Sequence, residues 1–251
     1  MNHYHLKERE WQFIYNNLQK ISWIRKSKVT DLRLFTEGVF FILKGGCQWR
    51  LLPLVYGKWQ TVYRRFIRWK EKGVWSDLFA DSIEDMDLQE VMLDGTIVRA
   101  HACAAGYRKD SGGEQGLGRS KGGFTSKIHA LVDGLGNPLK FIITGGNRNE
   151  IIKAQELVEN IENTTVIADK AYDSTEFRDH LEDKNCRHVI PPRRNRKIQY
   201  DYDEHVYIER HLIECFFGKL KHFRRIFSRF DKAKATFQAF IDFAATLISL
   251  R

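Results

Sequence analysis

Cysteine is scarce in this chain, and the few cysteines present argue against two common kinds of site. Cys47, Cys103, Cys186 and Cys215 are far apart in the 251 residues and form no CxxC pair. Neither a zinc site nor a disulfide framework is therefore expected, and a reducing cytoplasm fits this pattern.

Long apolar runs are also missing. The N-terminus has no apolar segment of the kind found in signal peptides, which argues against secretion. The best membrane candidate, residues 237–250, is too short to span a bilayer and contains Asp242, so we expect a buried helix there. Hydrophobic residues make up 43% of the chain, which is ample for a packed core.

Positive charge is in excess. Lys and Arg total 41 against 32 Asp and Glu, giving a formal net charge of +9. This balance favours a polyanionic partner through counterion release, and nucleic acid is the leading candidate. Many basic proteins never contact DNA, however, so the placement of the charge has to decide.

The N-terminal part of the chain has helical periodicity up to about residue 79, with no convincing strand. Within residues 57–70, one apolar stripe is formed by Trp59, Val62, Phe66 and Trp69. Arg64, Arg65 and Arg68 lie largely off that stripe. The segment resembles the last helix of a helix-turn-helix-like unit whose arginines contact DNA. An amphipathic helix with a solvated basic side explains it almost as well.

Strands dominate after the acidic stretch 81–85, which suits a linker. We predict strands at 91–98, 127–132, 139–144, 165–168 and 188–190, and helices at 150–163, 175–183, 204–230 and 236–250. This order predicts an α/β fold with a mixed sheet flanked by helices, as in ribonuclease-H-like folds. We therefore expect a small all-helical DNA-binding domain at 1–82 and a ribonuclease-H-like catalytic domain at 88–251.

Two aspartates occupy positions on predicted strands that favour function. Asp94 lies inside an apolar strand, where a lone charge is costly to bury unless it binds a metal or a cation. Asp169 follows the strand 165–168, and sites in α/β folds are usually built at the carboxyl ends of strands. Asp173 has the position of a helix N-cap, so we assign it a capping role.

A third acid lies on the predicted helix 204–230. Tyr207, Arg210, Glu214 and Lys221 fall on one face of an α-helix, so a carboxylate lies between two cations. The opposite face is apolar and would pack on a core; its members are Ile208, Leu212, Cys215, Phe216, Phe223 and Ile226. Taken alone, the charged face is more typical of a solvated helix with ion pairs, and the two acids on strands change that weighting. A packing role for Tyr207 and a structural pairing of Arg210 with Glu214 are the alternatives.

Asp94, Asp169 and Glu214 together make a candidate catalytic triad. Hard oxygen ligands without histidine or cysteine suit Mg2+, with Mn2+ as a substitute, rather than zinc. Two such ions would nearly neutralise three carboxylates and a bridging phosphodiester, which is the charge balance of two-metal phosphoryl transfer.

These motifs together resemble the DDE transposases of bacterial insertion sequences, specifically the insertion sequence 5 group. The resemblance rests on Tyr207-x2-Arg210-x3-Glu214-x6-Lys221, on residues 93–96 and on residues 168–173. It extends over almost the entire chain through residues 45–53, 57–69, 118–123, 190–193 and 216–225. His211 is a departure, because many relatives are expected to have asparagine there.

The resemblance implies a metal-binding triad of Asp94, Asp169 and Glu214, with Tyr207, Arg210 and Lys221 positioning the terminal DNA strand. It implies an enzyme that nicks double-stranded DNA at the terminal inverted repeats of its own element and joins the freed 3′ hydroxyls to target DNA. We expect a homodimer or larger assembly on paired ends, in the bacterial cytoplasm at the nucleoid and without a membrane partner.

Two basic segments are further candidates for DNA contact. One is the glycine-rich stretch 108–127, with Arg108, Lys109, Arg119, Lys121 and Lys127; the other contains Arg193, Arg194 and Arg196. Solvated loops explain both segments equally well. At the level of function, a catalytically inactive DNA-binding relative and a ribonuclease-H-like nuclease without strand transfer remain the alternatives.

Overall fold

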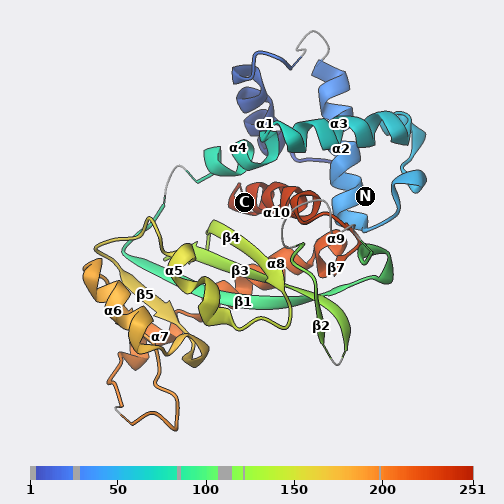
Figure 1. The fold of residues 1–251 in the computed structure, drawn as a ribbon. Helices are drawn as coiled ribbons and strands as arrows, with labels where there is room; N and C mark the ends of the chain where they lie inside the picture. Colours follow the sequence, from blue (N-terminus) through green and yellow to red (C-terminus); the bar gives the residue numbers. More distant parts are fainter. Residues whose placement is uncertain are drawn as a thin grey trace. The chain divides into compact units, whose positions relative to one another are not determined.

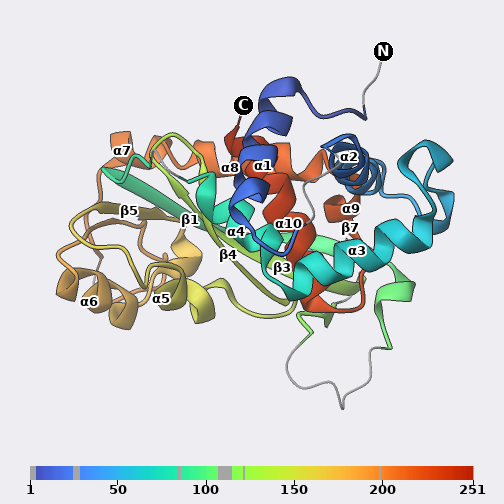
Figure 2. The ribbon, with the colours of Figure 1, turned by 90° about the horizontal axis from the view of Figure 1, so that it is seen from above.

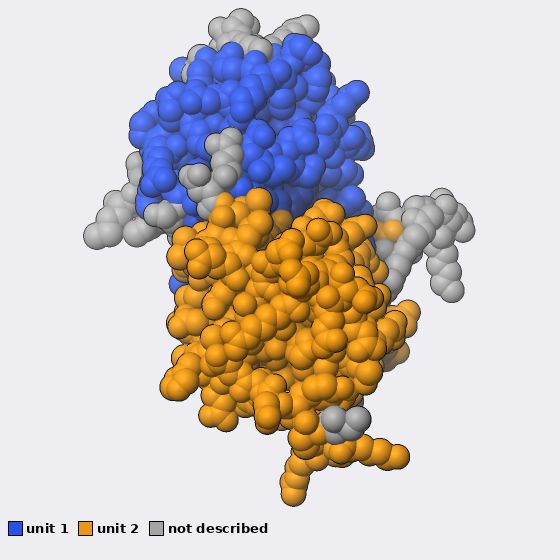
Figure 3. Space-filling model, turned by 90° about the vertical axis from the view of Figure 1, so that its left-hand side faces the viewer, with its two compact units in different colours: residues 1–84, 220–251 blue, residues 85–219 orange. Residues whose placement is uncertain are grey.

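The structure is a computed structural model that describes residues 4–24, 29–83, 86–106, 115–120, 122–197 and 199–250. Its contacts divide the chain into two compact units (Figure 3). Unit 1 comprises residues 1–84 and 220–251, and unit 2 comprises residues 85–219. Each unit has a core of its own and is described separately.

Unit 1 is built mainly of helices, as predicted for the N-terminal region (Figure 1). They are α1 (Glu8–Lys20), α2 (Val29–Gly45), α3 (Trp59–Glu71), α4 (Val74–Asp81), α9 (Arg224–Phe227) and α10 (Lys234–Ser249). The short strand β7 (Ser228–Arg229) and the 3-10 turns η1 (Trp49–Leu51) and η2 (Leu54–Tyr56) complete it.

Aromatic side chains form much of the core of unit 1. Phe66 on α3 stacks on Phe240 of α10 with ring centroids 4.6 Å apart, and Trp75 on α4 lies 5.0 Å from Phe243. Each fully buried ring of this kind contributes about 1.5–3 kcal/mol relative to exposure. Helix α10, predicted as a buried terminal helix, therefore joins the N-terminal helices in one core.

Unit 2 is organised around a mixed sheet. Its strands are β1 (Glu90–Ala100), β2 (Gly118–Ser120), β3 (Gly123–Asp133), β4 (Pro138–Gly145), β5 (Thr165–Ala168) and β6 (Arg187–Val189). The order is β2-β3-β1-β5-β6, with β4 also paired to β3. β1, β3 and β4 are antiparallel, whereas β5 and β6 continue the sheet in parallel from β1. The predicted ribonuclease-H-like mixed sheet is confirmed.

The turn between β3 and β4 follows directly from its sequence. The Asp133 carboxylate accepts hydrogen bonds from the backbone N–H groups of Leu135 and Asn137, at 3.0 and 2.7 Å. Gly136 has φ of 80°, in the left-handed region that glycine adopts without strain. This turn fixes the register of the antiparallel pair.

Helices cover both faces of the sheet of unit 2 (Figure 2). On one face, α5 (Ala154–Leu157) and α6 (Thr175–Asp183) pack on a cluster that includes Val91, Leu93 and Leu131. On the other face, Phe216 of α8 (His211–Lys221) stacks on Phe141 of β4 with centroids 5.7 Å apart. The remaining elements are α7 (Glu204–Ile208), η3 (Ala102–Ala104), η5 (Glu150–Lys153) and η6 (Lys170–Tyr172).

The predicted continuous helix 204–230 is wrong. The chain forms α7, α8 and α9 in succession, with a turn at residues 209–210 where hydrogen bonds run three residues back instead of four. This tightening shifts the helical phase, so Ile208 and Cys215 are exposed rather than buried. The buried side of α8 consists of Ile213, Phe216, Phe217 and Leu220.

The predicted helix 150–163 is also shorter than expected. It consists of η5 and the single turn α5, and Asn163 ends the segment in a left-handed conformation with φ of 54°. Val158, Asn160 and Asn163 are weak helix formers, which explains why propagation stops. β3 begins four residues before the predicted strand 127–132, and the short strands β2 and β7 were not predicted. The other predicted strands and the helices 175–183 and 236–250 lie within two residues of their predicted bounds.

Residues 220–251 belong by contacts to unit 1, although the sequence pattern grouped them with the catalytic domain. The assignment of DNA binding to residues 1–82 and of catalysis to residues 88–251 stays a prediction. Within the described ranges, no helix combines the length and apolar character required to cross a membrane.

Candidate active site

The register of two parallel strands brings Asp94 and Asp169 together. Leu93 of β1 is aligned with Ala168, the last residue of β5, so Asp94 and Asp169, which follow them in the chain, lie at the same level. Asp169 then caps η6 by accepting a hydrogen bond from the Ala171 N–H at 2.7 Å. The two acids predicted from separate strands are therefore neighbours in the structure.

Asp94 lies in a largely desolvated position. Burial raises the pKa of its carboxyl to about 6, against the opposing effects of the Gly95 N–H and of Arg210. The Gly95 N–H donates to Asp94 Oδ1 at 2.7 Å. An acid in this environment favours the approach of a cation, because a cation restores the stabilisation that water would otherwise provide.

Arg210 supplies such a cation. Its Nη1 lies 2.9 Å from Asp94 Oδ2, and its Nη2 pairs with the carboxylate of Glu214. The guanidinium thus bridges an acid on β1 and an acid on α8. Arg210 and Asp94 are 116 residues apart in the sequence. The Glu214 side chain is 56% exposed and reaches Asp94 only through Arg210.

Glu150 is the carboxylate that stands next to the two aspartates. One ligand oxygen each from Asp94, Glu150 and Asp169 lies within 4.8 Å of the others. Glu150 is the first residue of η5 and follows β4, which runs in the same direction as β1 and β5. The carboxylate groups that the structure brings together are thus Asp94, Asp169 and Glu150, and Glu214 lies outside this cluster.

Tyr207 lies on α7, and its ring is adjacent to Arg210. The Arg210 guanidinium lies over the Tyr207 ring, 5.9 Å from the ring centroid. Tyr202 packs against Tyr207 at 5.5 Å. Tyr207, Arg210 and Glu214 therefore remain connected even though the helix between them is interrupted.

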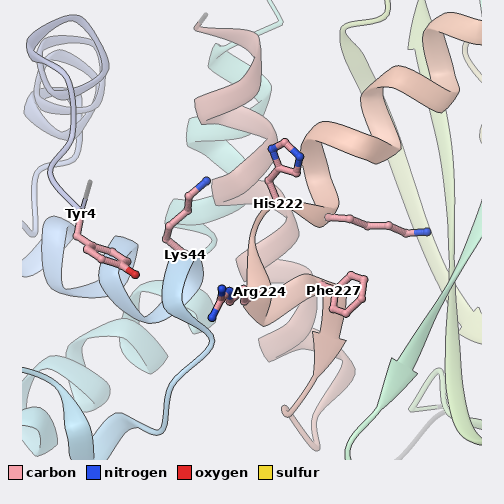
Figure 4. A pocket seen from close by; sticks show the side chains of 6 residues that line it. Tyr4, Lys44, His222, Arg224 and Phe227 are labelled. Carbon is pink, nitrogen blue, oxygen red and sulfur yellow. The ribbon is translucent and has the colours of Figure 1, made fainter. Parts of the chain in front are cut away.

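Lys221 lies at the end of α8 and belongs by contacts to unit 1. It lines a basic pocket of about 610 Å³ with Tyr4, Lys44, His222, Arg224 and Phe227 (Figure 4). In the close-up, Tyr4 and Phe227 lie on opposite sides of Arg224. We call this the basic pocket; its cations and aromatic rings are suited to a phosphate or a nucleotide.

The three arginines predicted for DNA binding on α3 differ in their surroundings. The Arg65 guanidinium packs over the rings of Phe35 and Trp69, at 4.4 and 5.3 Å, and burial lowers its pKa. Arg64 and Arg68 are exposed. Arg65 thus serves the core of unit 1, and the exposed pair is the part of this helix available to a partner.

The segment 191–197 is held to the body of unit 2 by Asp173. This buried carboxylate accepts hydrogen bonds from the Arg178 and Arg196 guanidinium groups and from the Arg193 N–H. The predicted capping role of Asp173 is wrong, because the N-cap of α6 is Ser174 and Asp173 binds arginines instead.

The predicted DNA-binding arginines of this segment are not equivalent. The Arg193 guanidinium donates to the carbonyl groups of Lys170 and Ala171, and Arg196 also packs on Tyr200 at 4.7 Å. Arg194 is exposed, and no contact of its side chain is found in the described part of the chain. DNA binding by these three residues stays a prediction.

The glycine-rich stretch 108–127 is only partly described. Arg108, Lys109 and Lys121 lie outside the described residues. Lys127 is buried and pairs with Glu150 at 2.9 Å, so it does not extend from a solvated loop. Arg119 on β2 is exposed.

Sequence reasoning missed Glu150 and Tyr172 as members of this site. Tyr172 is fully buried, and its hydroxyl has no hydrogen-bond partner among the described residues. A weak signal for Glu150 was available, because it lies five residues beyond the end of β4, whereas Asp169 directly follows β5. Because Glu150 was assigned to the start of the predicted helix 150–163, it was not considered as a site residue.

Comparison with known proteins identifies the family. Residues 6–79 match the family model "Putative transposase of IS4/5 family", and residues 86–248 match "Transposase DDE domain". The chain is 36% identical over 131 residues to the "Putative transposase for insertion sequence element IS6501" of Brucella ovis, covering 51% of this chain and 99% of that protein.

A second relative is the "Putative transposase for insertion sequence element IS402" of Burkholderia cepacia. It is 30% identical over 135 residues, which cover 49% of this chain and 62% of that protein. Among solved structures, a piggyBac transposase synaptic complex with hairpin DNA matches with a TM-score of 0.36 and 12% identity. That match covers 76% of this chain, which spans 43% of the piggyBac chain. From the two family matches, the chain belongs to the DDE transposases of bacterial insertion sequences.

Proposed function

We propose that this chain is a transposase that cuts DNA at the ends of its own insertion sequence and joins the freed 3′ hydroxyls to target DNA by two-metal-ion phosphoryl transfer. The observation that carries the proposal is the alignment of Leu93 with Ala168, which makes Asp94 and Asp169 neighbours within a DDE family match.

The residues at this site fit a divalent ion. The donor set consists of carboxylate oxygens, which suit Mg2+ and, as a substitute, Mn2+. The buried Tyr172 hydroxyl without a partner among the described residues also favours a further polar occupant. Asp94 and Asp169 would hold the ions together with Glu214, which the family signature supplies. Bound ions would polarise the attacking oxygen and stabilise the leaving oxygen.

Arg210 has two roles in this proposal. In the structure, its guanidinium forms ion pairs with both Asp94 and Glu214. A DNA phosphate competes for the same guanidinium, because arginine binds phosphate and carboxylate with the same fork of N–H donors. Binding of the terminal strand would thus free Glu214 for the ions, while the Tyr207 ring would keep the guanidinium oriented through their cation–π contact.

The DNA contacts are proposed on three surfaces. Arg64 and Arg68 on α3 are exposed cations of the helical unit, the basic pocket contains Lys221, and Arg194 is an exposed cation of unit 2. The partners are the terminal inverted repeats and the target duplex, bound by a homodimer or larger assembly on paired ends. A DNA substrate of this kind places the protein at the nucleoid in the cytoplasm.

The test incubates the full chain with Mg2+, labelled element ends and a plasmid target. We expect joined products from the wild type. Asp94→Asn, Asp169→Asn and Glu214→Gln should each lower joining by about a hundredfold or more, because each removes several kcal/mol of charge stabilisation. Binding of element ends should persist. Asp179→Asn, an exposed acid on α6, is the matched control and should join normally.

Two other outcomes would replace the proposal. Cleavage without joined products would identify a ribonuclease-H-like nuclease without strand transfer. Binding of element ends with neither cleavage nor joining would identify a catalytically inactive DNA-binding relative.

A further inference from the structure

We propose that Glu150 is a carboxylate ligand of the divalent ion at this site, together with Asp94 and Asp169, and that this ion binds before Glu214 is engaged. The inference rests on the proposed metal-dependent function and adds an acid that the family signature does not contain. It predicts metal binding by the protein in the absence of DNA.

The first argument is proximity. Oxygen atoms of Asp94, Glu150 and Asp169 all lie within 4.8 Å of one another, close enough for one ion to contact all three after small side-chain adjustments. Glu214 is outside this group, and its carboxylate is paired with Arg210. The arrangement therefore provides three carboxylates for an ion without Glu214.

The second argument is that the fold makes room for Glu150 at this place. A Cβ atom on Gly95 would lie 2.9 Å from Glu150 Cγ, which is closer than real Cβ contacts allow. Gly95 follows Asp94 directly, so the absence of a side chain there lets Glu150 lie against β1 beside Asp94. On the other side, Lys127 Nζ holds Glu150 Oε1 at 2.9 Å, and both side chains are largely buried.

The third argument is independent of the acids. Tyr172 is 0% exposed, and its hydroxyl has no hydrogen-bond partner among the described residues. Burial, followed by the charges of Asp94, Glu150 and Asp169, raises the pKa of this hydroxyl. Buried hydroxyl groups nearly always have a partner, so a polar ligand such as ion-bound water is needed to complete this site.

The charges around the cluster leave it short of positive charge. With Glu214 included, four carboxylates share two cations, Arg210 between Asp94 and Glu214 and Lys127 on Glu150, which leaves two negative charges. No cation pairs with Asp169 in the described part of the chain. One divalent ion would compensate for this deficit, and it would do so without displacing either ion pair completely.

The test measures Mn2+ affinity of the full chain by isothermal titration calorimetry, without DNA. Neutralising Glu150 alone would leave the Lys127 ammonium buried without its partner, so both variants carry Lys127→Met, and K127M is the reference. We expect K127M/E150Q to bind Mn2+ at least about tenfold more weakly than K127M. Glu162→Gln, an exposed acid of the same unit, is the matched control and should bind Mn2+ as the wild type does. Equal affinities of K127M and K127M/E150Q would overturn the proposal.

Tyr172→Phe gives a second readout. Because the hydroxyl has no hydrogen-bond partner among the described residues, the variant should melt at the wild-type temperature or above when Mn2+ is absent. Its upward shift in melting temperature with Mn2+ should be smaller than that of the wild type. A full wild-type shift would mean that the hydroxyl does not contribute to ion binding.

The outcome is distinguishable from failure of the proposed function. If D94N and D169N abolish both Mn2+ binding and joining while K127M/E150Q binds like K127M, the transposase assignment stands and Glu150 is only the partner of Lys127. If D94N joins DNA normally, the proposed function itself fails.

Discussion

Asp94 and Asp242 are two acids whose pKa values are raised by burial, with different consequences. The pKa of Asp94 is about 6, and the carboxyl has Arg210 beside it in the candidate active site. The pKa of Asp242 on α10 is about 7, and only the Gln238 amide, 2.7 Å away, opposes the effect of burial. The environment of Asp94 therefore favours a bound cation, whereas ionisation of Asp242 destabilises the helical core of unit 1.

Asp242 makes unfolding pH dependent in a defined direction. Its pKa is about 7 in the folded chain against 3.8 for the ordinary group, so between these values the folded state holds a proton that the unfolded state has lost. Stability therefore falls as the pH rises from about 4 to about 7 and is level above that. Asp242→Asn should be more stable than the wild type at pH 8, by up to about 4 kcal/mol, with little difference at pH 4.

Urea unfolding at the two pH values measures this difference. Asp179→Asn serves as the control, because Asp179 is exposed and should leave the pH profile unchanged. A D242N profile parallel to that of the wild type would show that Asp242 is not the group responsible.

Among the elements, the break between α7 and α8 matters most for the candidate active site, because Arg210 lies in it. Hydrogen bonds from Arg210 N to Tyr207 O and from Leu212 N to Glu209 O run three residues back, which tightens the chain at this point. Periodicity predicted one helix here, because each half satisfies the helical pattern separately. Local periodicity gives no information on the ion pair between Arg210 and Asp94, which joins the turn to a strand far away in the sequence.

The segment 191–197 allows the roles of its arginines to be separated. Arg194→Gln should reduce the slope of log affinity against log salt for DNA by about 1, because it removes one exposed phosphate contact. It should not change stability. Arg196→Gln should lower stability by about 1–3 kcal/mol, since Arg196 hydrogen bonds the buried Asp173. Filter binding over a salt series and urea unfolding measure the two effects.

Equal effects of the two variants would contradict this division. A salt slope left unchanged by R194Q would remove the segment from the DNA interface. A stability left unchanged by R196Q would mean that Arg178 alone is enough to hold Asp173.

For the whole molecule, the proposed tasks belong to different compact units. The acids of the site are in unit 2, and the exposed arginines of α3 are in unit 1. The net charge of +9 favours DNA binding in general but assigns it to no surface. The exposed positions of Arg64 and Arg68, and the packing of Arg65 on aromatic rings, give the charge a location.

Separate tasks predict separable defects. Arg64→Gln combined with Arg68→Gln should weaken binding of element ends and lower the salt slope by about 2, with Mn2+ affinity unchanged. Asp94→Asn should do the reverse, losing Mn2+ affinity while binding DNA. Fluorescence anisotropy and calorimetry measure the two properties. A loss of Mn2+ affinity in R64Q/R68Q would contradict this separation of DNA binding from metal binding. Lys58→Gln removes another exposed cation near the same helix and is the matched control.

The sequence alone determined the kinds of elements, most of the strands, and the places of Asp94 and Asp169 in and after two neighbouring strands. Burial alternates along a strand or recurs along a helix, so local patterns carry this information, and an acid inside an apolar strand stands out against it. The tertiary structure decided that Glu150 joins the aspartates, that Arg210 holds Glu214, and that Asp173 binds arginines instead of capping a helix. These contacts depend on strand register and on segments far apart in the chain meeting at one place, which no local pattern records.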